Sequence, residues 1–553
     1  MTTAEVLVKC LENEGVQYIY GIPGEENLEV IEALKGSSIK FITVRHEQGA
    51  AFMADMQGRL TGKAGVCLAT LGPGATNLVT GVADANMDGA PLVAITGQVG
   101  TDRMHHMTSH QNLDLETLFA PITHKTKQVV RPDTVNEIVR IAFKYAEGAP
   151  GASHIDLPCN IAAMEVPEGP GQKPLRRQVP VSSRAGDAMI RQAAEMIARA
   201  DRPVVLAGAD AVRSGAAEAL TNFMHSLGIA VVNTMMAKGA VPCDDPLSMW
   251  TVGIPHMDYQ NVLLRKADLI IGVGYDIVEY SPEKWNHGGH ANILSIGRRP
   301  IQVNRMYQPN LEVIGDIAYT LGEISKVLHG RKKADAGWAL EIGREMRAEH
   351  ESYSSDTSFP MKPQRVLCDV RRSLGAADIL VSDVGAHKMW IARHYNCFEP
   401  NTCIISNGFA TMGIGVPGAF AAKLLFPEKR VLTITGDGGF MMNCQEIETA
   451  VRMHVSFVTL IFRDSHYGLI KWKQEDRFGS SSCVGFGNPD FVKFAESMGA
   501  IGYRVTKAEE LPDILENAFR QEVPVIIDCP IDYSENTKLT AHEAEIWKRY
   551  MGE

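Results

Sequence analysis

The chain has 553 residues, of which 45% are hydrophobic and 22% charged, and its net charge is −11. This length is too great for one hydrophobic core and predicts three domains of ordinary size. The acidic balance, without a basic block, argues against a nucleic-acid partner. No stretch approaches the roughly 20 apolar residues of a membrane span, so no membrane partner is expected.

The ten cysteines are scattered singly along the chain, without a C-x-x-C pair or a Cys/His cluster. This pattern predicts reduced thiols and argues against a zinc site. The first residues carry acids but no basic segment, which argues against a secretory leader. We therefore expect a cytoplasmic protein.

Helix and strand patterns alternate through residues 1–165. Such alternation predicts a parallel sheet with helices on both faces. In chain order, apolar residues at helical spacing or in short strand-like runs predict a helix at 4–15, a strand at 16–21, a helix at 27–34, strands at 40–45 and 64–70 around a helix at 47–62, a loop and helix at 72–89, and a strand at 91–97.

A segment rich in Pro, Gly and basic residues, 166–186, predicts a linker to a second α/β unit. That unit is expected to contain a helix at 188–200 and strands at 203–208, 229–234 and 269–274. A polar stretch at 329–360 separates it from a third unit. The sequence thus predicts an α/β fold of three doubly wound parallel-sheet domains, at residues 1–165, 185–335 and 360–553.

In the third unit, a β-branched and apolar run ends abruptly at Gly436-Asp437-Gly438-Gly439. Because ligands of open parallel sheets bind at the carboxyl ends of strands, this loop is a candidate site. It could be a tight turn, a nucleotide phosphate loop or a metal clamp. The Lys and Ser/Thr of a G-x-x-x-x-G-K-[ST] loop are missing, and the glycines do not form G-x-G-x-x-G.

A second carboxylate favours the metal clamp. Asp464 ends the next strand-like run, and the segment between has helical spacing. Two carboxylates at the ends of neighbouring strands, beside glycines that let a phosphate approach, are typical of Mg²⁺ that bridges protein and phosphate. A pair of turn-forming aspartates is the alternative.

A Gly-Asp-Gly loop, a helix and a strand ending in Asp resemble the thiamine-diphosphate motif. The resemblance implies that Asp437, Asp464 and the backbone carbonyl of His466 are the Mg²⁺ ligands. One departure is Arg463, which stands where these enzymes usually carry Asn.

Glu47 follows a strand-like run and begins a helical pattern. Alone, it is explained by the helix dipole, which favours an acid in the first turn. Together with "GIPGEENLEV" and "TLGPGATNLVTGVADANMDGAPLVAITG", however, it resembles the pyrimidine-binding domain of acetolactate synthases. The resemblance implies that Glu47 hydrogen-bonds the aminopyrimidine ring of the cofactor and promotes loss of the thiazolium C2 proton.

Three further stretches resemble the same family. "DVGAHKMW" is similar to its diphosphate loop, "SNGFATMGIGVPGAF" to its pyrimidine loop, and "MTSHQNLDLETLF" to the segment whose glutamine, here Gln111, faces the reacting carbon. Met412 matches the residue that bends the cofactor, although core packing also explains a methionine. The implied cofactor-binding residues are Val384, Gly385, Ala386, His387, Ala410 (through its carbonyl), Met412, Gly436, Gly438, Gly439 and Tyr467.

The stretches "YDIVEYSPEKWN" and "YQPNLEVIGDI" favour the catabolic, flavin-independent type of acetolactate synthase. The resemblance implies thiamine diphosphate, Mg²⁺, a 2-keto acid substrate and active sites between the subunits of a homodimer or homotetramer. The expected reaction joins two pyruvates into 2-acetolactate and CO2, with FAD absent. The alternatives are another thiamine-diphosphate decarboxylase or acyltransferase, and a non-catalytic sensor that binds the cofactor.

Overall fold

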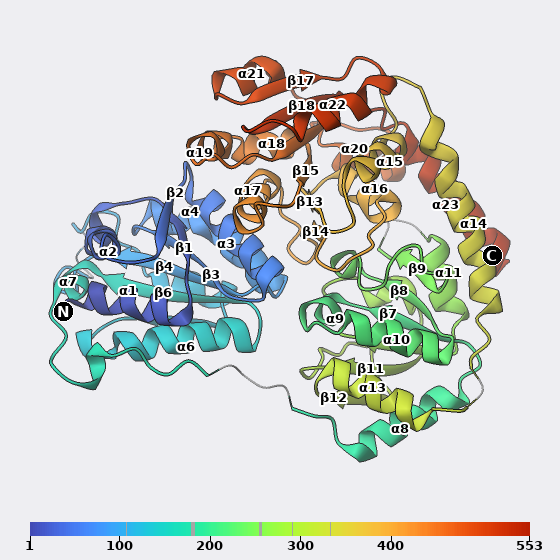
Figure 1. Cartoon of the computed structure of the whole chain (residues 1–553), viewed down its shortest axis with the longest axis horizontal. Coiled ribbons are helices and arrows are strands. Elements are labelled where there is room, and N and C mark those ends of the chain that lie inside the picture. Colours follow the sequence, from blue (N-terminus) through green and yellow to red (C-terminus); the bar gives the residue numbers. More distant parts are fainter. Residues whose placement is uncertain are drawn as a thin grey trace.

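The chain forms three parallel six-stranded sheets, each packed on both faces by helices (Figure 1). This confirms the predicted α/β fold of three doubly wound sheets. The sheets define a first, a middle and a third unit in chain order. The computed structural model describes residues 1–104, 106, 108–178, 183–253, 257–289, 291–331 and 333–552.

The first unit has the strand order β2-β1-β3-β4-β6-β5. Its strands are β1 (Tyr18–Gly21), β2 (Lys40–Thr43), β3 (Gly65–Ala69), β4 (Leu92–Gln98), β5 (Lys125–Gln128) and β6 (Ala152–Pro158). Its helices are α1 (Thr3–Glu14), α2 (Leu28–Leu34), α3 (Glu47–Thr61), α4 (Pro73–Met87), α5 (Leu115–Phe119), α6 (Val135–Gly148) and α7 (Cys159–Ala163). Local sequence explains their ends: Thr2 and Glu5 form a capping box before α1, and Gly15 ends it in the left-handed conformation.

The middle unit has the order β12-β11-β10-β7-β8-β9. Its strands are β7 (Pro203–Ala207), β8 (Ala230–Asn233), β9 (Ser248–Thr251), β10 (Leu269–Val273), β11 (Asn292–Gly297) and β12 (Leu311–Ile314). Its helices are α8 (Asp187–Arg199), α9 (Ala209–Arg213), α10 (Ala217–Leu227), α11 (Tyr259–Lys266), α12 (Pro282–Trp285) and α13 (Ile317–Val327). The polar stretch that follows contains a further helix, α14 (Gly337–Glu351).

The third unit has the order β14-β13-β15-β16-β18-β17. Its strands are β13 (Ile379–Ser382), β14 (Cys403–Ile405), β15 (Val431–Gly436), β16 (Val458–Arg463), β17 (Ile501–Arg504) and β18 (Val525–Pro530). Its helices are α15 (Pro363–Ser373), α16 (Ala386–His394), α17 (Gly415–Leu425), α18 (Asp437–Asn443), α19 (Glu446–Arg452), α20 (Gly468–Phe478), α21 (Phe491–Ser497), α22 (Leu511–Ala518) and α23 (Glu535–Met551).

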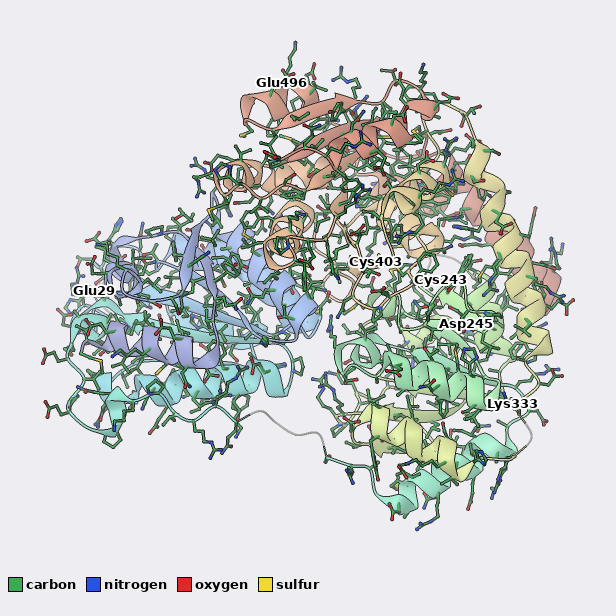
Figure 2. All side chains as sticks on the ribbon, viewed as in Figure 1. Glu29, Cys243, Asp245, Lys333, Cys403 and Glu496 are labelled. Carbon is green, nitrogen blue, oxygen red and sulfur yellow. The ribbon has the colours of Figure 1, made fainter. Side chains whose placement is uncertain are left out.

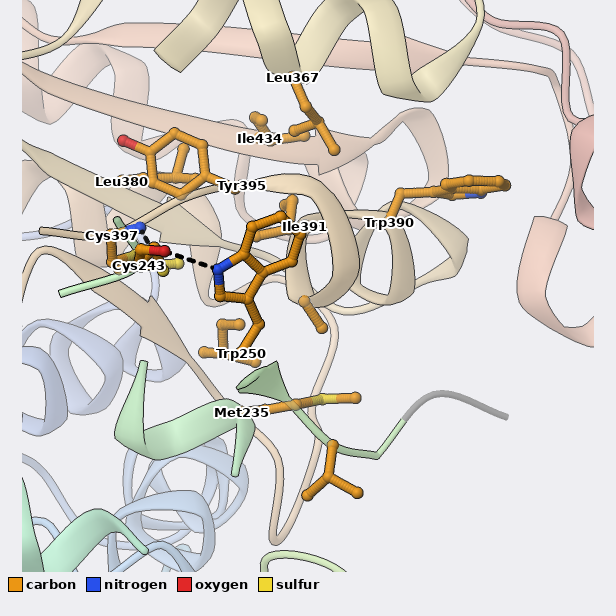
Figure 3. Packing of buried hydrophobic residues seen from close by; sticks show 14 of the residues in the cluster. Met235, Cys243, Trp250, Leu367, Leu380, Trp390, Ile391, Tyr395, Cys397 and Ile434 are labelled. Atoms are coloured by element: carbon orange, nitrogen blue, oxygen red, sulfur yellow. Dashed lines mark hydrogen bonds between the residues drawn. The ribbon is translucent and has the colours of Figure 1, made fainter. Parts of the chain in front are cut away.

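The third unit packs against both of the others. One hydrophobic core is continuous between the first and third units, where α3 lies against α17 (Figure 1). A second core joins the middle and third units, and Cys243 and Cys403 lie at that junction (Figure 2). There Trp250 Nε1 donates to the carbonyl of Cys243 at 2.9 Å, and the amide of Cys397 contacts Cys243 Sγ (Figure 3).

The ten cysteines all lie in the described part of the chain, and none of them forms a disulfide. Among the described residues, no helix is both long enough and apolar enough to cross a membrane.

Candidate active site

Asp437 and Asp464 lie at the same edge of the third sheet. β15 and β16 pair in parallel with Gly436 opposite Phe462, so the residues that follow each strand emerge together. Burial raises the pKa of the Asp437 carboxyl. Burial and, after it, the charge of Asp437 raise the pKa of Asp464 to about 6. Two carboxylates therefore share a poorly hydrated position, which a cation would stabilise.

Backbone and amide groups hold these carboxylates in place. The amide of Ser465 and Nδ2 of Asn488 donate to Asp437 Oδ2 at 2.7 and 2.8 Å. The amide of His466 donates to Asp464 Oδ1 at 3.2 Å, and the His466 ring lies 2.7 Å from the carbonyl oxygen of Asp464. The His466 ring is thus turned toward its own backbone. Ser465 has a φ of +59°, a conformation that strains a non-glycine residue.

The predicted diphosphate loop, 384–387, connects β13 to the first turn of α16. His387 is buried, and its Nε2 has no hydrogen-bond partner. Burial lowers the pKa of His387 to about 3, so the ring is neutral. The loop faces the Gly-Asp-Gly turn, because a Cβ added at Gly436 would lie 3.5 Å from the His387 ring. Gly438 in turn is covered by Tyr467, whose ring would lie 2.9 Å from an added Cβ.

Asp383 ties the loops of the third unit together, and sequence reasoning missed it. Its buried carboxylate accepts hydrogen bonds from the amides of Val384, Gly413 and Gly415 and from Thr435 Oγ1. It therefore joins the diphosphate loop, the pyrimidine loop and the end of β15. The signal was available, since Asp383 ends a buried strand as Asp437 does.

The pyrimidine loop carries the second predicted group of the third unit. Ala410 has a φ of +56°, and Gly413 has a φ of +93°. Met412, between them, is half-buried. A strained alanine beside the predicted cofactor contact indicates that this backbone is held for function.

In the first unit, Glu47 is the first residue of α3 and is 8% exposed. Asn77 Nδ2 donates to Glu47 Oε2 at 2.9 Å. A Cβ added at Gly74 would lie 3.4 Å from Glu47 Oε1, and one added at Gly72 would lie 2.7 Å from the Cβ of Gln111. The glycine loop that begins α4 therefore lies between the two predicted catalytic residues.

Gln111 is exposed and has a φ of +56°. Its loop is tied to the sheet by Gln98, whose Nε2 donates to the carbonyl of Leu113 at 2.9 Å. The predicted residues thus gather in two groups, one in the first unit and one in the third. Within the described part of the chain, no hydrogen bond or ion pair joins Glu47 or Gln111 to Asp437 or Asp464.

Comparisons with known proteins match all three units of the chain. Residues 1–118 match the thiamine pyrophosphate enzyme N-terminal TPP binding domain, 190–324 the central domain, and 383–529 the C-terminal TPP binding domain. The acetolactate synthase of Bacillus subtilis (strain 168) is 36% identical over 97% of this chain and 94% of its own. The chain belongs to the thiamine-diphosphate-dependent acetolactate synthase family.

Other relatives in this family show the same coverage. The catabolic acetolactate synthase of Raoultella terrigena is 35% identical over 97% of this chain and 96% of its own. A probable acetolactate synthase large subunit of Methanocaldococcus jannaschii is 35% identical over 97% and 93%.

The residues present fit the family's cofactor. The unpartnered His387 Nε2 is a buried polar atom beside the Gly-Asp-Gly turn, as a diphosphate site requires. The two buried carboxylates supply the hard oxygen donors that Mg²⁺ prefers. Among the described residues, no three His, Cys, Asp or Glu side chains cluster as metal ligands, so a third protein ligand in the site has to come from the backbone or another side chain.

Two departures from the family pattern have structural explanations. Arg463 Nε donates to Asp528 Oδ1 at 2.6 Å, so its partner is an acidic neighbour on the adjacent strand β18. The second is Arg298, which follows strand β11 at a position where relatives tend to carry an acidic residue, and it forms an ion pair with Asp210. Neither arginine therefore needs a phosphate as its partner.

Proposed function

We propose that the protein is an acetolactate synthase that decarboxylates one pyruvate and joins the product to a second, giving 2-acetolactate and CO2. The observation that carries this is the pairing of Glu47 and Gln111 around one glycine loop. It occurs in a chain whose relatives over nearly its whole length are named acetolactate synthases, one of them catabolic.

The third unit would hold the cofactor. Asp437, Asp464 and the carbonyl of His466 would bind Mg²⁺, and the loop 384–387, which includes His387, would hold the diphosphate. Gly436, Gly438 and Gly439 admit the phosphates, and Tyr467 closes over them. The Ala410 carbonyl and Met412 would make the contacts to the pyrimidine ring that the family resemblance implies. When bound, thiamine diphosphate supplies the electron sink for loss of the carboxylate.

The first unit would supply the proton chemistry. The Glu47 carboxylate would hydrogen-bond the aminopyrimidine nitrogen and hold or release a proton there, which is the chemistry the cofactor needs for activation. Asn77 orients the Glu47 carboxylate through its 2.9 Å hydrogen bond. The Gln111 amide donates to the oxygen that becomes negative when the acceptor ketone reacts.

Exposed apolar side chains around both groups support a site between subunits. Phe409, Met441, Met442, Tyr467 and Ile470 in the third unit and Leu113 beside Gln111 are all 40–48% exposed. Such patches commonly mark interaction surfaces. We propose a homodimer or homotetramer in which the first unit of one copy faces the third unit of another. An active monomer in size-exclusion chromatography at assay concentration contradicts this.

Glu279 supports the absence of FAD. In dinucleotide-binding sheets, the pyrophosphate lies at the amide groups that follow the first strand. Here both oxygens of the buried Glu279 carboxylate accept from the amide of Ala209, the first residue after Gly208 at the end of β7, at 3.0 and 2.9 Å. Glu279 therefore occupies the amide that a phosphate would need at this position. The absorption spectrum of the purified protein tests this, and flavin bands contradict it.

The decisive experiment is incubation with pyruvate, thiamine diphosphate and Mg²⁺, followed by identification of the product. Acetolactate supports the proposal. Acetaldehyde without acetolactate identifies a simple decarboxylase, and an acetyl ester formed with phosphate or coenzyme A identifies an acyltransferase. Cofactor binding without turnover identifies a sensor. Each of these three results overturns the proposal.

We also propose a cytoplasmic location for the protein. We further propose that its domains comprise residues 1–165, 185–335 and 360–553. Limited proteolysis tests the first boundary, because the segment 166–186 has no α-helix or strand among its described residues. Cleavage there, with intact fragments on either side, is the expected result.

A further inference from the structure

We propose that Glu446 and Asn443 of the third unit are positioning residues that hold the chain on both sides of Glu47, Glu446 through the backbone before it and Asn443 through the side chain of Gln48 after it. The inference rests on the proposed function of Glu47. It extends that function, because it assigns to the segment after the Gly-Asp-Gly turn a task away from the cofactor phosphates.

Glu446 binds the backbone that leads into α3. Its carboxylate accepts from the amide of Arg45 at 3.1 and 3.3 Å and from the amide of His46 at 3.1 Å. These are the two residues directly before Glu47. Thr449 Oγ1 donates to the other side of the carboxylate at 2.7 Å, and Glu446 is fully buried. A carboxylate at the start of a 15-residue helix is also favoured by the helix dipole.

Asn443 holds the residue on the other side of Glu47. Its Nδ2 donates to Gln48 Oε1 at 3.1 Å and to the carbonyl of Gly413 at 2.9 Å. Asn443 is 1% exposed, so both hydrogen bonds are shielded from water. It therefore connects the residue after Glu47 with the residue after Met412.

Gly49 is needed for the close approach of Glu446. A Cβ added at Gly49 would lie 2.8 Å from Glu446 Oε1. A side chain at this position would displace the carboxylate from the two amides. The contact thus depends on matched residues in two units far apart in the chain.

The two positioning residues belong to the same short segment as a predicted metal ligand. α18 begins at Asp437 and ends at Asn443, and α19 begins at Glu446. Placement errors of about 1 Å can cost about a hundredfold in rate. The segment α18–α19 would therefore support both the backbone before Glu47 and the Gly-Asp-Gly turn. This role explains why the Glu446 carboxylate is buried.

A purely structural role for Glu446 makes a different prediction. In that case, its loss lowers the stability of the whole protein without a local effect at residues 45–48. The two roles are separated by measurements that report on these residues directly, one of which needs no cofactor.

The test compares three variants. Glu446→Gln keeps the shape but removes the charge and replaces Oε2, which accepts from the Arg45 amide and Thr449 Oγ1, by an NH2 group that cannot accept. Thr449→Val removes the hydroxyl that orients the carboxylate. The control, Glu448→Gln, lies two residues away on the same helix. It pairs with the side chains of Arg452 and, at 4.0 Å, of Arg45, so it removes a side-chain contact to this segment while the backbone contacts of Glu446 stay in place.

The first readout is hydrogen–deuterium exchange of the apoprotein, and the second is the rate of C2 proton exchange of bound thiamine diphosphate, measured by NMR. Glu446→Gln is expected to raise deuterium uptake in the peptide that contains Arg45 and His46. It should also slow C2 exchange about tenfold or more. Thr449→Val should raise the uptake and slow C2 exchange by smaller amounts. Glu448→Gln should match the wild type in both measurements.

Unchanged uptake at 45–46 in Glu446→Gln, or wild-type C2 exchange despite raised uptake, overturns the inference. If Glu446→Gln does not fold, the same two measurements on Thr449→Val decide. Failure of the proposed function is recognised separately, because the wild type then makes no acetolactate while the apoprotein exchange result stands.

Discussion

Helix α3 is held at both of its ends, and the interactions at the two ends differ in kind. At the amino end, the Glu446 carboxylate receives backbone amides next to Glu47. At the carboxyl end, Arg59 forms buried ion pairs, each at 2.8 Å, with Asp55, Asp84 and Asp88.

The carboxyl end also reaches the pyrimidine loop. Asp88 accepts from the amides of Asn407, Gly408 and Phe409 at 3.1, 2.7 and 3.2 Å. Burial alone would lower the pKa of Arg59, but the three carboxylates raise it well above its usual value. One helix thus has the proposed proton-transfer residue, Glu47, at its amino end. At its carboxyl end it has a network of charges that stabilises the fold and positions the pyrimidine loop.

The largest effect is expected at the amino end. Glu47→Gln removes the group that shares a proton with the cofactor, so acetolactate formation and C2 exchange should fall by at least about a hundredfold. Thiamine diphosphate affinity should change little, because the phosphate contacts lie in the third unit. Measured turnover equal to that of the wild type shows that the proton relay is wrong.

The next effect is on stability at the carboxyl end. Arg59→Ala leaves three buried carboxylates without their cation and should lower the free energy of unfolding by about 3–5 kcal/mol. Urea unfolding measures this. The control is Arg131→Ala, which removes an exposed pair with Asp133 and should leave the unfolding midpoint unchanged. Equal urea unfolding midpoints for Arg59→Ala and Arg131→Ala would show that the buried Arg59 network does not stabilise the protein more than an exposed ion pair does.

A smaller effect is expected at Asp88, which binds both the pyrimidine loop and Arg59. Asp88→Asn keeps one acceptor oxygen for the three loop amides, so thiamine diphosphate affinity should fall about tenfold. A cofactor titration measures it. Glu14→Gln is the matched control, because Glu14 is a buried carboxylate paired with Arg140 within the first unit. Loss of affinity in the control as well points to general destabilisation instead.

The smallest effect is expected from Gly49→Ala, which tests the contact between Glu446 and the amino end of α3. Gly49→Ala pushes against the end of a flexible side chain, so C2 exchange should slow only on the order of threefold to tenfold. Gly36→Ala is the control, since an added Cβ there meets open space. An unaffected Gly49→Ala shows that Glu446 can move without disturbing Glu47.

Sequence reasoning predicts the two groups of site residues because their signals are local. Asp437, Asp464 and Glu47 each end or follow a strand-like run, and parallel strands bring such positions to one edge of a sheet. It did not identify β5, whose sequence KTKQ lacks apolar alternation because the strand lies at the sheet edge. It also treated the stretch containing α14 only as a separator.

The residues that sequence reasoning missed have partners far along the chain. Asp88 binds amides more than 300 residues away, and Glu446 binds amides 400 and 401 residues away. Arg463 was noticed as a departure, but only the pairing of β16 with β18 shows that Asp528 is its partner. Such pairings depend on how sheets and units pack, which no local pattern contains.

The sequence by itself determined the family and the three α/β sheets, and it predicts the residues that would hold the cofactor, because these follow from short motifs and the periods of helices and strands. Only the tertiary structure decided what supports those residues. Glu446, Asn443, Asp383 and the Arg59 network act across loops and units, where burial makes each hydrogen bond and charge depend on a distant partner.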